Sequence, residues 1–192
     1  MTGICRFMGV SIELRNDKGG IPMVNQITLK GAINGMAENQ YLLAQKYYYG
    51  IGEDKNIPVA EGWYEEAAKN GHTASMFMYA YLLLSGEGTK INLKKGTKYL
   101  KRASARNYMH AILLLARNYY YGYGVERNLK RAFKLWEKGT RLGCAEAEYY
   151  LGLCYGKGIY VKRNLIKSKK HLFNAFENGF FVAQQAINDM LN

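Results

Sequence analysis

Apolar side chains recur along this chain in short segments, at the three- and four-residue spacing of amphipathic helices. In one segment, residues 108–121, they fall on a single helical face: Ala111, Leu114, Leu115 and Tyr119. The next segment carries a second apolar face: Phe133, Leu135 and Trp136. The pattern predicts two helices joined by a turn, with Tyr119 and Trp136 buried between them and Gly122 in the turn.

This helix pair recurs with a period of 36 residues. The period spaces glycines that can end the first helix in the left-handed conformation: Gly50, Gly86, Gly122 and Gly158,. It also spaces asparagines that can cap the second helix: Asn56, Asn92, Asn128 and Asn164,. Large residues of the second helix follow it (Tyr64, Leu100, Trp136 and Leu172), as do small ones (Ala67, Ala103, Gly139 and Ala175). Such a period is typical of a solenoid, whose repeats bury their apolar faces against their neighbours.

The period sets the expected domain organisation. Four repeats cover residues 37–72, 73–108, 109–144 and 145–180. Residues 1–36 are expected to form a degenerate first repeat, because Ile21-Pro22 precedes Ile57-Pro58 by 36 residues; its opening helix would cover Ile4 to Leu14. Residues 181–192 would form a polar capping helix. We therefore expect an all-α chain that is a single domain over residues 1–192.

The best-formed copy has a recognisable order of residues: Leu115-Ala116, Tyr119, Gly122, Gly124-Val125, Asn128, Arg131-Ala132, Trp136 and Gly143. This order resembles the Sel-one-like repeat (SLR) family, a relative of the tetratricopeptide repeat. The resemblance implies a right-handed α-α superhelix of about five helix pairs plus a C-terminal capping helix. It also implies a binding scaffold rather than an enzyme. The fourth copy has Tyr160 where the second glycine belongs, so we expect a different turn there.

In tetratricopeptide-type arrays the first helix of each repeat lines a concave groove, and the resemblance implies which residues face it. The expected partner-binding residues are Tyr41, Gln45, Tyr48, Phe77, Tyr81, Leu84, Leu113, Arg117, Tyr120 and Tyr149. Tyr121, Leu153 and Lys157 would also face the groove. Tyrosine and arginine are favoured anchors at interfaces, and Arg117 could pair with a carboxylate. The alternative is that some of these side chains pack against the neighbouring repeat.

The net charge of +12 is unevenly distributed. Residues 1–88 hold 7 basic and 9 acidic residues, a net −2, whereas residues 89–192 hold 20 and 6, a net +14. Equivalent positions form two basic rows on the second helices: Lys95, Arg131 and Lys167, and then Lys98, Lys134 and Lys170. These rows are either solvated helix faces or a track for a partner that is acidic in part.

Candidate chemistry is sparse. His72, His110 and His171 are isolated and lack the spacing of metal ligands, so we expect no metal, no cofactor and no enzyme,. His72 follows a helix-ending glycine, which favours an interaction with that helix C-terminus. Cys144 and Cys154 would lie too far apart along one helix to form a disulfide, which favours a reducing compartment, the cytoplasm. No apolar run is long enough for a membrane span,. Arg6 interrupts the apolar stretch near the start, so this stretch makes a poor signal peptide,.

Three functions remain open. The first is a non-enzymatic scaffold or adaptor that binds a protein or peptide in its groove. The second is an immunity or antitoxin-type inhibitor that neutralises a bacterial toxin by direct binding, because small relatives of the family are encoded beside secreted toxins. The third is nucleic-acid binding through the basic rows. The third is disfavoured, because helical repeats read bases from the groove-lining helix, which here carries few cations beyond Arg117 and Lys157,.

Overall fold

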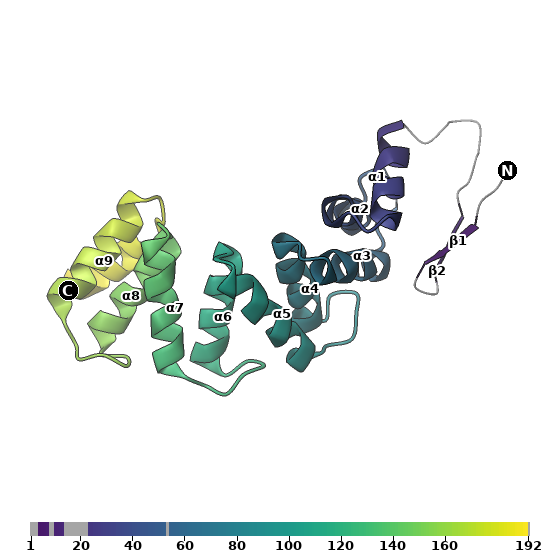
Figure 1. Cartoon of the computed structure of the whole chain (residues 1–192). Helices are drawn as coiled ribbons and strands as arrows, with labels where there is room; N and C mark the ends of the chain where they lie inside the picture. The colour runs from purple at the N-terminus through teal and green to yellow at the C-terminus, as the bar shows by residue number, and fades with distance from the viewer. Residues whose placement is uncertain (1–3, 8–9, 14–22, 53, 192) are drawn as a thin grey trace. The chain divides into compact units, whose positions relative to one another are not determined.

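The computed structural model describes residues 4–7, 10–13, 23–52 and 54–191, and these residues form ten helices and two short strands (Figure 1). The helices are α1 (Met23–Ile33), α2 (Ala37–Tyr49), α3 (Ile57–Lys69), α4 (Thr73–Ser85), α5 (Leu93–Ala105), α6 (Met109–Tyr121), α7 (Leu129–Arg141), α8 (Ala145–Lys157), α9 (Leu165–Glu177) and α10 (Ala183–Leu191). From α2 to α9 they alternate as first and second helices of four helix–turn–helix repeats. The predicted all-α fold class is confirmed.

The opening helix expected over Ile4–Leu14 is wrong. Strands β1 (Ile4–Phe7) and β2 (Val10–Glu13) pair there as an antiparallel hairpin, in a register that joins Ile4 to Glu13 and Phe7 to Val10. The β-branched residues Ile4, Val10 and Ile12 favour extended backbone,. The Ile21-Pro22 pair and Asn192 lie outside the described residues.

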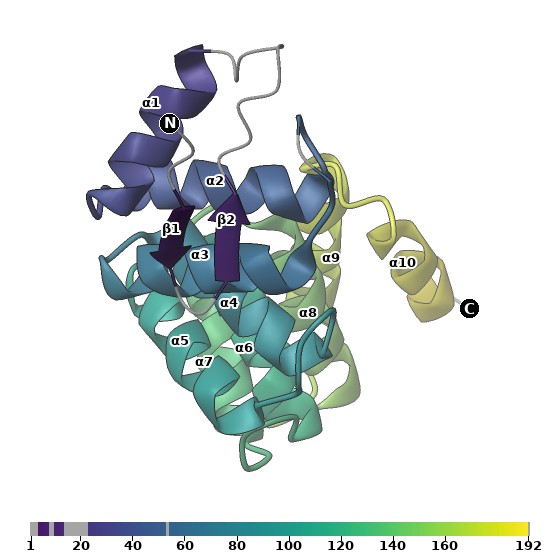
Figure 2. The same ribbon diagram turned by 90° about the vertical axis from the view of Figure 1, so that its right-hand side faces the viewer.

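The chain divides within α5 into two compact units, an N-terminal unit of residues 1–99 and a C-terminal unit of residues 100–192. In the N-terminal unit α1 packs on α2, α2 on α3, and α3 on α4. In the C-terminal unit each helix from α6 to α10 packs on the next one in sequence. Figure 2 shows the units from a second side. The most extensive helix contacts within each unit are therefore between neighbours in the sequence.

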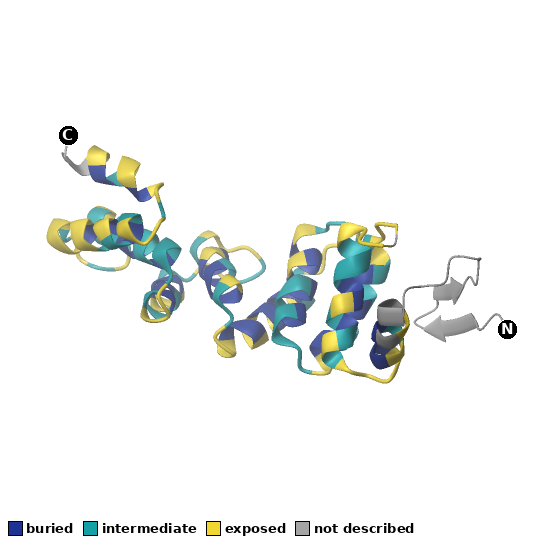
Figure 3. Cartoon of the chain, turned by 90° about the horizontal axis from the view of Figure 1, so that it is seen from above, coloured by how far each residue is buried: buried dark blue, intermediate teal, exposed yellow. Residues whose placement is uncertain are grey.

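Large and small residues at repeat-equivalent positions make the core of each unit. Tyr64, Leu100, Trp136 and Leu172 are all at most 2% exposed, and Tyr119 is 6% exposed, so the predicted burial of Trp136 and Tyr119 is confirmed. The small residues let helices approach closely: a Cβ added to Gly139 in α7 would lie 2.7 Å from the Cβ of Ala147 in α8,. Figure 3 shows the buried faces in dark blue between neighbouring helices and the exposed faces in yellow.

The four repeat asparagines hold the turn inside each helix pair. Each side-chain oxygen accepts a hydrogen bond from the backbone N–H three residues later, at 3.1 Å for Asn56, 3.0 Å for Asn92, and 2.9 Å for Asn128 and Asn164. Each asparagine also donates its own backbone N–H to a carbonyl of the preceding helix: Tyr47, Leu83, Tyr119 and Tyr155, at 2.7–2.9 Å. One residue thus caps the second helix and ties it to the first.

The turn keeps its backbone conformation even where the glycine pattern fails. Gly122 ends α6 with φ +82°, which confirms its role in the turn. Tyr160 has φ +63°, close to +66° for the equivalent Gly124, so the different turn expected at Tyr160 is wrong. A tyrosine in the left-handed region costs about 1–2 kcal/mol. The ring of Tyr160 packs on Phe133, with centroids 5.5 Å apart, and this contact offsets part of the strain.

Replacing Asn128 by alanine removes the cap acceptor for the Arg131 N–H while leaving the backbone bond to Tyr119. The free energy of unfolding, measured by urea denaturation, should fall by about 0.5–2 kcal/mol. Asn128→Asp retains a cap acceptor and should lose far less. Equal losses in the two variants would contradict the capping role.

Candidate functional site

The aromatic residues of α2 are largely engaged within the N-terminal unit. The Tyr41 ring lies 4.4 Å from His72 and 6.1 Å from Tyr64, and Gln45 Nε2 donates to the Tyr41 hydroxyl at 2.8 Å. The Tyr48 hydroxyl donates to the carboxylate of Glu87, at 3.1 and 3.2 Å to its two oxygens. Burial, together with this hydrogen bond, raises the pKa of Tyr48 to about 12,. Tyr41, Gln45 and Tyr48 are half-buried, so each offers a partner only part of its surface.

The expected partner-binding residues of α4 divide between surface and core. Tyr81 is 38% exposed, and its ring lies 6.5 Å from that of the half-buried Phe77. Leu84 was expected in the groove but is only 4% exposed, because it packs on α5: a Cβ added to Gly96 would lie 2.8 Å from Leu84 Cγ. Leu84 is therefore a core residue, and Tyr81 offers the larger exposed surface.

The equivalent residues of the C-terminal unit also differ in exposure. Leu113 is 8% exposed and belongs to the core rather than to a binding surface, whereas Arg117 is exposed. Tyr120 is half-buried, with its ring 5.7 Å from Trp136. Tyr149 is half-buried too, and its ring packs 5.2 Å from Phe180 against the core between α9 and α10. Arg117 is therefore exposed, and Tyr120 and Tyr149 each keep part of their surface exposed.

A small cavity, here called the aromatic cavity, lies among α6, α7 and α8. Its volume is about 180 Å³, and it is lined by Arg117, Tyr120, Tyr121, Trp136, Tyr150, Leu153, Cys154, Lys157 and Ile159. Trp136 stacks on Tyr150, with centroids 5.0 Å apart and ring planes 12° from parallel. The buried Nε1 of Trp136 finds no hydrogen-bond acceptor among the described residues. The cavity thus combines aromatic walls with two cationic side chains.

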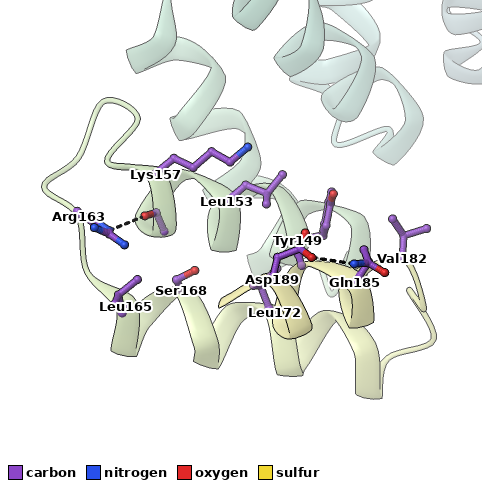
Figure 4. Close-up of a pocket in the computed structure, with 12 residues that line it drawn as sticks. Tyr149, Leu153, Lys157, Arg163, Leu165, Ser168, Leu172, Val182, Gln185 and Asp189 are labelled. Atoms are coloured by element: carbon purple, nitrogen blue, oxygen red, sulfur yellow. Dashed lines mark hydrogen bonds between the residues drawn. The ribbon is translucent and has the colours of Figure 1, made fainter. Parts of the chain in front are cut away.

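A larger cavity, here called the terminal cavity, lies among α8, α9 and α10 (Figure 4). It encloses about 530 Å³ and is lined by Tyr149, Leu153, Gly156, Lys157, Arg163, Leu165, Ser168, Leu172, Val182, Gln185, Ala186 and Asp189. Several of its polar groups already have partners. Ser168 Oγ donates to the Gly152 carbonyl at 2.7 Å, and Gln185 Nε2 donates to Asp189 at 2.7 Å. The two cavities share Leu153 and Lys157 and are therefore adjacent.

The two basic rows behave differently. Each cation of the first row lies over a tyrosine ring of the preceding helix: Lys95 over Tyr79 at 5.1 Å, Arg131 over Tyr119 at 5.4 Å, and Lys167 over Tyr155 at 5.2 Å. Through these cation–π contacts, each side chain of the first row packs on the other helix of its own pair. Lys98, Lys134 and Lys170 of the second row are exposed.

Lys95 also forms an ion pair across two helices. Its Nζ donates to the carboxylate of Glu65 in α3 at 2.8 Å, and Lys69 lies 3.4 Å from the same oxygen. Burial opposes ionisation of Glu65, but the hydrogen bond and charge of Lys95 outweigh it and lower the pKa of Glu65 below its ordinary value,. Lys95 is thus a stabilising residue of the N-terminal unit.

The histidines have structural partners. The His72 side chain caps α4 through Nδ1, which accepts from the Ser75 N–H at 3.2 Å, so the expected interaction with the preceding helix C-terminus is wrong for this side chain. Burial lowers the pKa of His72 despite the nearby Glu38, and the neutral ring suits an acceptor. His171 lies 2.6 Å from Glu148 and stacks on Tyr155.

The described residues contain no group of three or more His, Cys, Asp or Glu side chains able to hold a metal ion. None of their helices combines the length and the apolar character that crossing a membrane requires.

Comparisons with known proteins place this geometry in a family context. The model of the Sel1 repeat matches residues 37–72, 73–108, 110–144 and 145–180. A solved Sel1 repeat protein from Oxalobacter formigenes is 28% identical, with a TM-score of 0.79 over 88% of this chain and 68% of its own. No curated protein matches the sequence.

Two other solved structures share the fold. A protective antigen present in uropathogenic Escherichia coli strains, displaying an SLR fold, is 22% identical, with a TM-score of 0.77 over 81% of this chain and 33% of its own. Cysteine rich protein B of Helicobacter pylori is 20% identical, with a TM-score of 0.53 over 68% of this chain and 97% of its own. At these identities the likeness shows the fold alone.

Trp136 forms the wall between α6 and α8, and its removal should destabilise the protein strongly. Trp136→Ala should lower the free energy of unfolding by about 3–5 kcal/mol, because it leaves a large cavity in the core. Phe173→Ala, at a 43% exposed position of α9, is the control and should cost much less. Chemical denaturation measures both variants, and similar losses would disprove the role of Trp136 in the core.

The Lys95–Glu65 pair predicts a pH-dependent stability difference. The folded pKa of Glu65 is depressed, so its stabilisation is present above the unfolded-state pKa, about 4.3, and is lost as the pH falls through the lower folded pKa,. Lys95→Met should therefore cost up to about 1 kcal/mol at pH 7, and this cost should shrink from about pH 5 to pH 3. Lys98→Met, at an exposed position, is the control. A cost of Lys95→Met that stays constant with pH would disprove the coupling.

Proposed function

The chain belongs to the Sel1 repeat family, and we propose that it binds a partner protein or peptide, without catalysis, through its C-terminal unit. Sel1 repeat proteins are generally protein–protein interaction scaffolds. The observation that carries the proposal is the pair of adjacent cavities lined by the first helices α6, α8 and α10, with Arg117 and Lys157 beside them. Concave, mostly apolar sites with a few polar groups are the usual binding places of proteins.

Charge supports an acidic partner. Residues 89–192 carry a net +14, and the exposed Lys134 and Lys170 stand on the helices α7 and α9 that back the cavities. Cations at the rim of an interface mainly speed encounter with a partner of opposite charge, whereas buried anchors set the lifetime of the complex. We assign the first role to these lysines and the second to the residues of the cavities.

A direct-binding inhibitor of the immunity type is a special case of this scaffold, and it would use the same surface. The proposed location is the cytoplasm. Cys144 and Cys154 are free thiols, and burial raises the pKa of Cys154 to about 12, which keeps this sulfur protonated and unreactive,.

The test starts from a partner captured from the native host, identified by mass spectrometry and then purified. The double variant Lys134→Glu/Lys170→Glu should lower its association rate about tenfold at low salt, and the salt dependence of that rate should weaken. Lys30→Glu/Lys55→Glu makes the same charge change among residues 1–88 and should change the rate little. If both double variants lower the association rate equally, the effect is one of net charge alone, and Lys134 and Lys170 have no specific role.

The residues beside the cavities provide a second measurement with the same partner. Arg117→Ala and Tyr120→Ala should each weaken binding by about 2 kcal/mol, mainly through faster dissociation. Thermal denaturation of the same samples shows whether either variant has lost its fold. Folded variants that bind like the parent would remove the C-terminal unit from the proposal.

A further inference from the structure

The terminal cavity and the aromatic cavity are the same gap in two consecutive repeats. Six lining residues of the aromatic cavity have counterparts 36 residues later in the lining of the terminal cavity. Among them are three rings that pack together: Tyr120 corresponds to Gly156, Trp136 to Leu172, and Tyr150 to Ala186. In the aromatic cavity these three rings pack on one another, at 5.7 Å and 5.0 Å from the central indole of Trp136. In the terminal cavity all three rings are missing.

The missing rings account for the difference in volume. The terminal cavity is roughly three times as large as the aromatic cavity, at about 530 Å³ against about 180 Å³. Its volume lies within the range of about 300–1,000 Å³ that is usual for ligand sites. The space that aromatic side chains fill in one repeat is left open in the next.

The walls of the terminal cavity favour an apolar group. Leu153, Leu165, Leu172 and Val182 line it, and the Ser168 hydroxyl among them is satisfied by the Gly152 carbonyl. Figure 4 shows Leu153 on α8 and Leu172 on α9 flanking the space, with Gln185 and Asp189 of α10 joined to each other by their hydrogen bond. An aromatic side chain that entered would replace water against apolar walls, which is favourable in proportion to the area buried.

The adjacent aromatic cavity favours an anion. Arg117 and Lys157, both exposed, line it from α6 and α8. A carboxylate accepts hydrogen bonds from donors of this kind, and a guanidinium can bind it in bidentate geometry. Because the cavities share Leu153 and Lys157, a short peptide can reach both.

We propose that the C-terminal unit recognises a peptide segment in which an acidic residue stands two positions before an aromatic one, with the ring in the terminal cavity and the carboxylate between Arg117 and Lys157. This inference rests on the proposed function and specifies the chemistry of the partner. It commits to a protein segment because the two subsites differ in character, one apolar and one anionic. A small aromatic molecule would satisfy only one of them.

Four synthetic peptides test the proposal on the full chain by titration calorimetry: Ser-Glu-Gly-Trp-Ser, Ser-Gln-Gly-Trp-Ser, Ser-Lys-Gly-Trp-Ser and Ser-Glu-Gly-Ala-Ser, all with blocked ends. The first should bind most tightly. Glutamine for glutamate should weaken binding about tenfold, and lysine should weaken it further. Alanine for tryptophan should abolish binding. N-acetyltryptophanamide, which carries the ring alone, should bind at least tenfold more weakly than the first peptide.

Two protein variants connect each half of the peptide to its cavity. Ala186→Tyr restores a ring of the preceding repeat to the half-buried Ala186 position and should abolish binding of all the tryptophan peptides. Ala105→Tyr, at an exposed site of α5, is the matched control and should bind like the parent. Arg117→Gln/Lys157→Gln should make the glutamate and glutamine peptides bind equally. If Ala186→Tyr fails to fold, the smaller Ala186→Leu fills part of the same space and should weaken binding at least fivefold.

The outcomes separate this inference from the function on which it rests. Equal binding of the glutamate and lysine peptides, or undiminished binding by folded Ala186→Tyr, would overturn the inference. N-acetyltryptophanamide binding as tightly as the best peptide would overturn it too, in favour of a small-molecule site. The captured partner is measured against the same variants. If the partner still requires Arg117 and Tyr120 while Ala186→Tyr leaves its affinity unchanged, the scaffold stands and only the inference falls.

Discussion

Every repeat of this protein depends on one asparagine that makes two hydrogen bonds in opposite directions. The side chain accepts from the first turn of the second helix, and the backbone N–H donates to a carbonyl near the end of the first helix. Both partners are polar backbone groups that would otherwise end a helix unpaired, so the residue satisfies two requirements at once. The bridge therefore joins the two helices of a pair at their turn. Tyr160 shows how strong the constraint is, since a tyrosine is held in the left-handed conformation to preserve the turn.

Packing between helices reinforces the bridge. It also engages many of the basic and tyrosine side chains that the sequence suggests for partner binding. Lys95, Arg131 and Lys167 lie over tyrosine rings of their own helix pairs, which turns a row of charges into part of the fold. Tyr41 and Tyr48 are held by Gln45 and Glu87. These contacts satisfy polar atoms at the edge of an apolar core, where a hydroxyl or ammonium without a partner would be costly. Lys98, Lys134 and Lys170, one turn further along the same helices, remain exposed.

In such an array, the positions that differ between repeats are the ones that can determine what is bound. The turn and the cap are nearly invariant from copy to copy, whereas the residues between consecutive first helices change in size and charge. Around Trp136 three aromatic rings fill the gap, and around Leu172 the same gap is open. A repeat can exchange side chains there without disturbing its asparagine bridge, so a binding surface can vary while the fold stays constant.

The sequence by itself determined the period, the helix pairs, the caps and the core positions, because each of these is a local or nearest-neighbour property. Asn128 caps the second helix of its repeat, and Trp136 is buried, as the 36-residue pattern predicted.

Tertiary structure decided which first-helix residues are exposed. Leu84 and Leu113 occupy positions expected in the groove, yet neighbouring helices bury them. The hairpin at Ile4–Phe7 and Val10–Glu13, by contrast, follows from local β preference, which prevails there over the repeat. The terminal cavity could have been suspected from Gly156, Leu172 and Ala186 alone. Its existence still depended on how α10 packs against α8 and α9, because an apolar gap closes or stays open according to the helices around it rather than the residues of any one of them,.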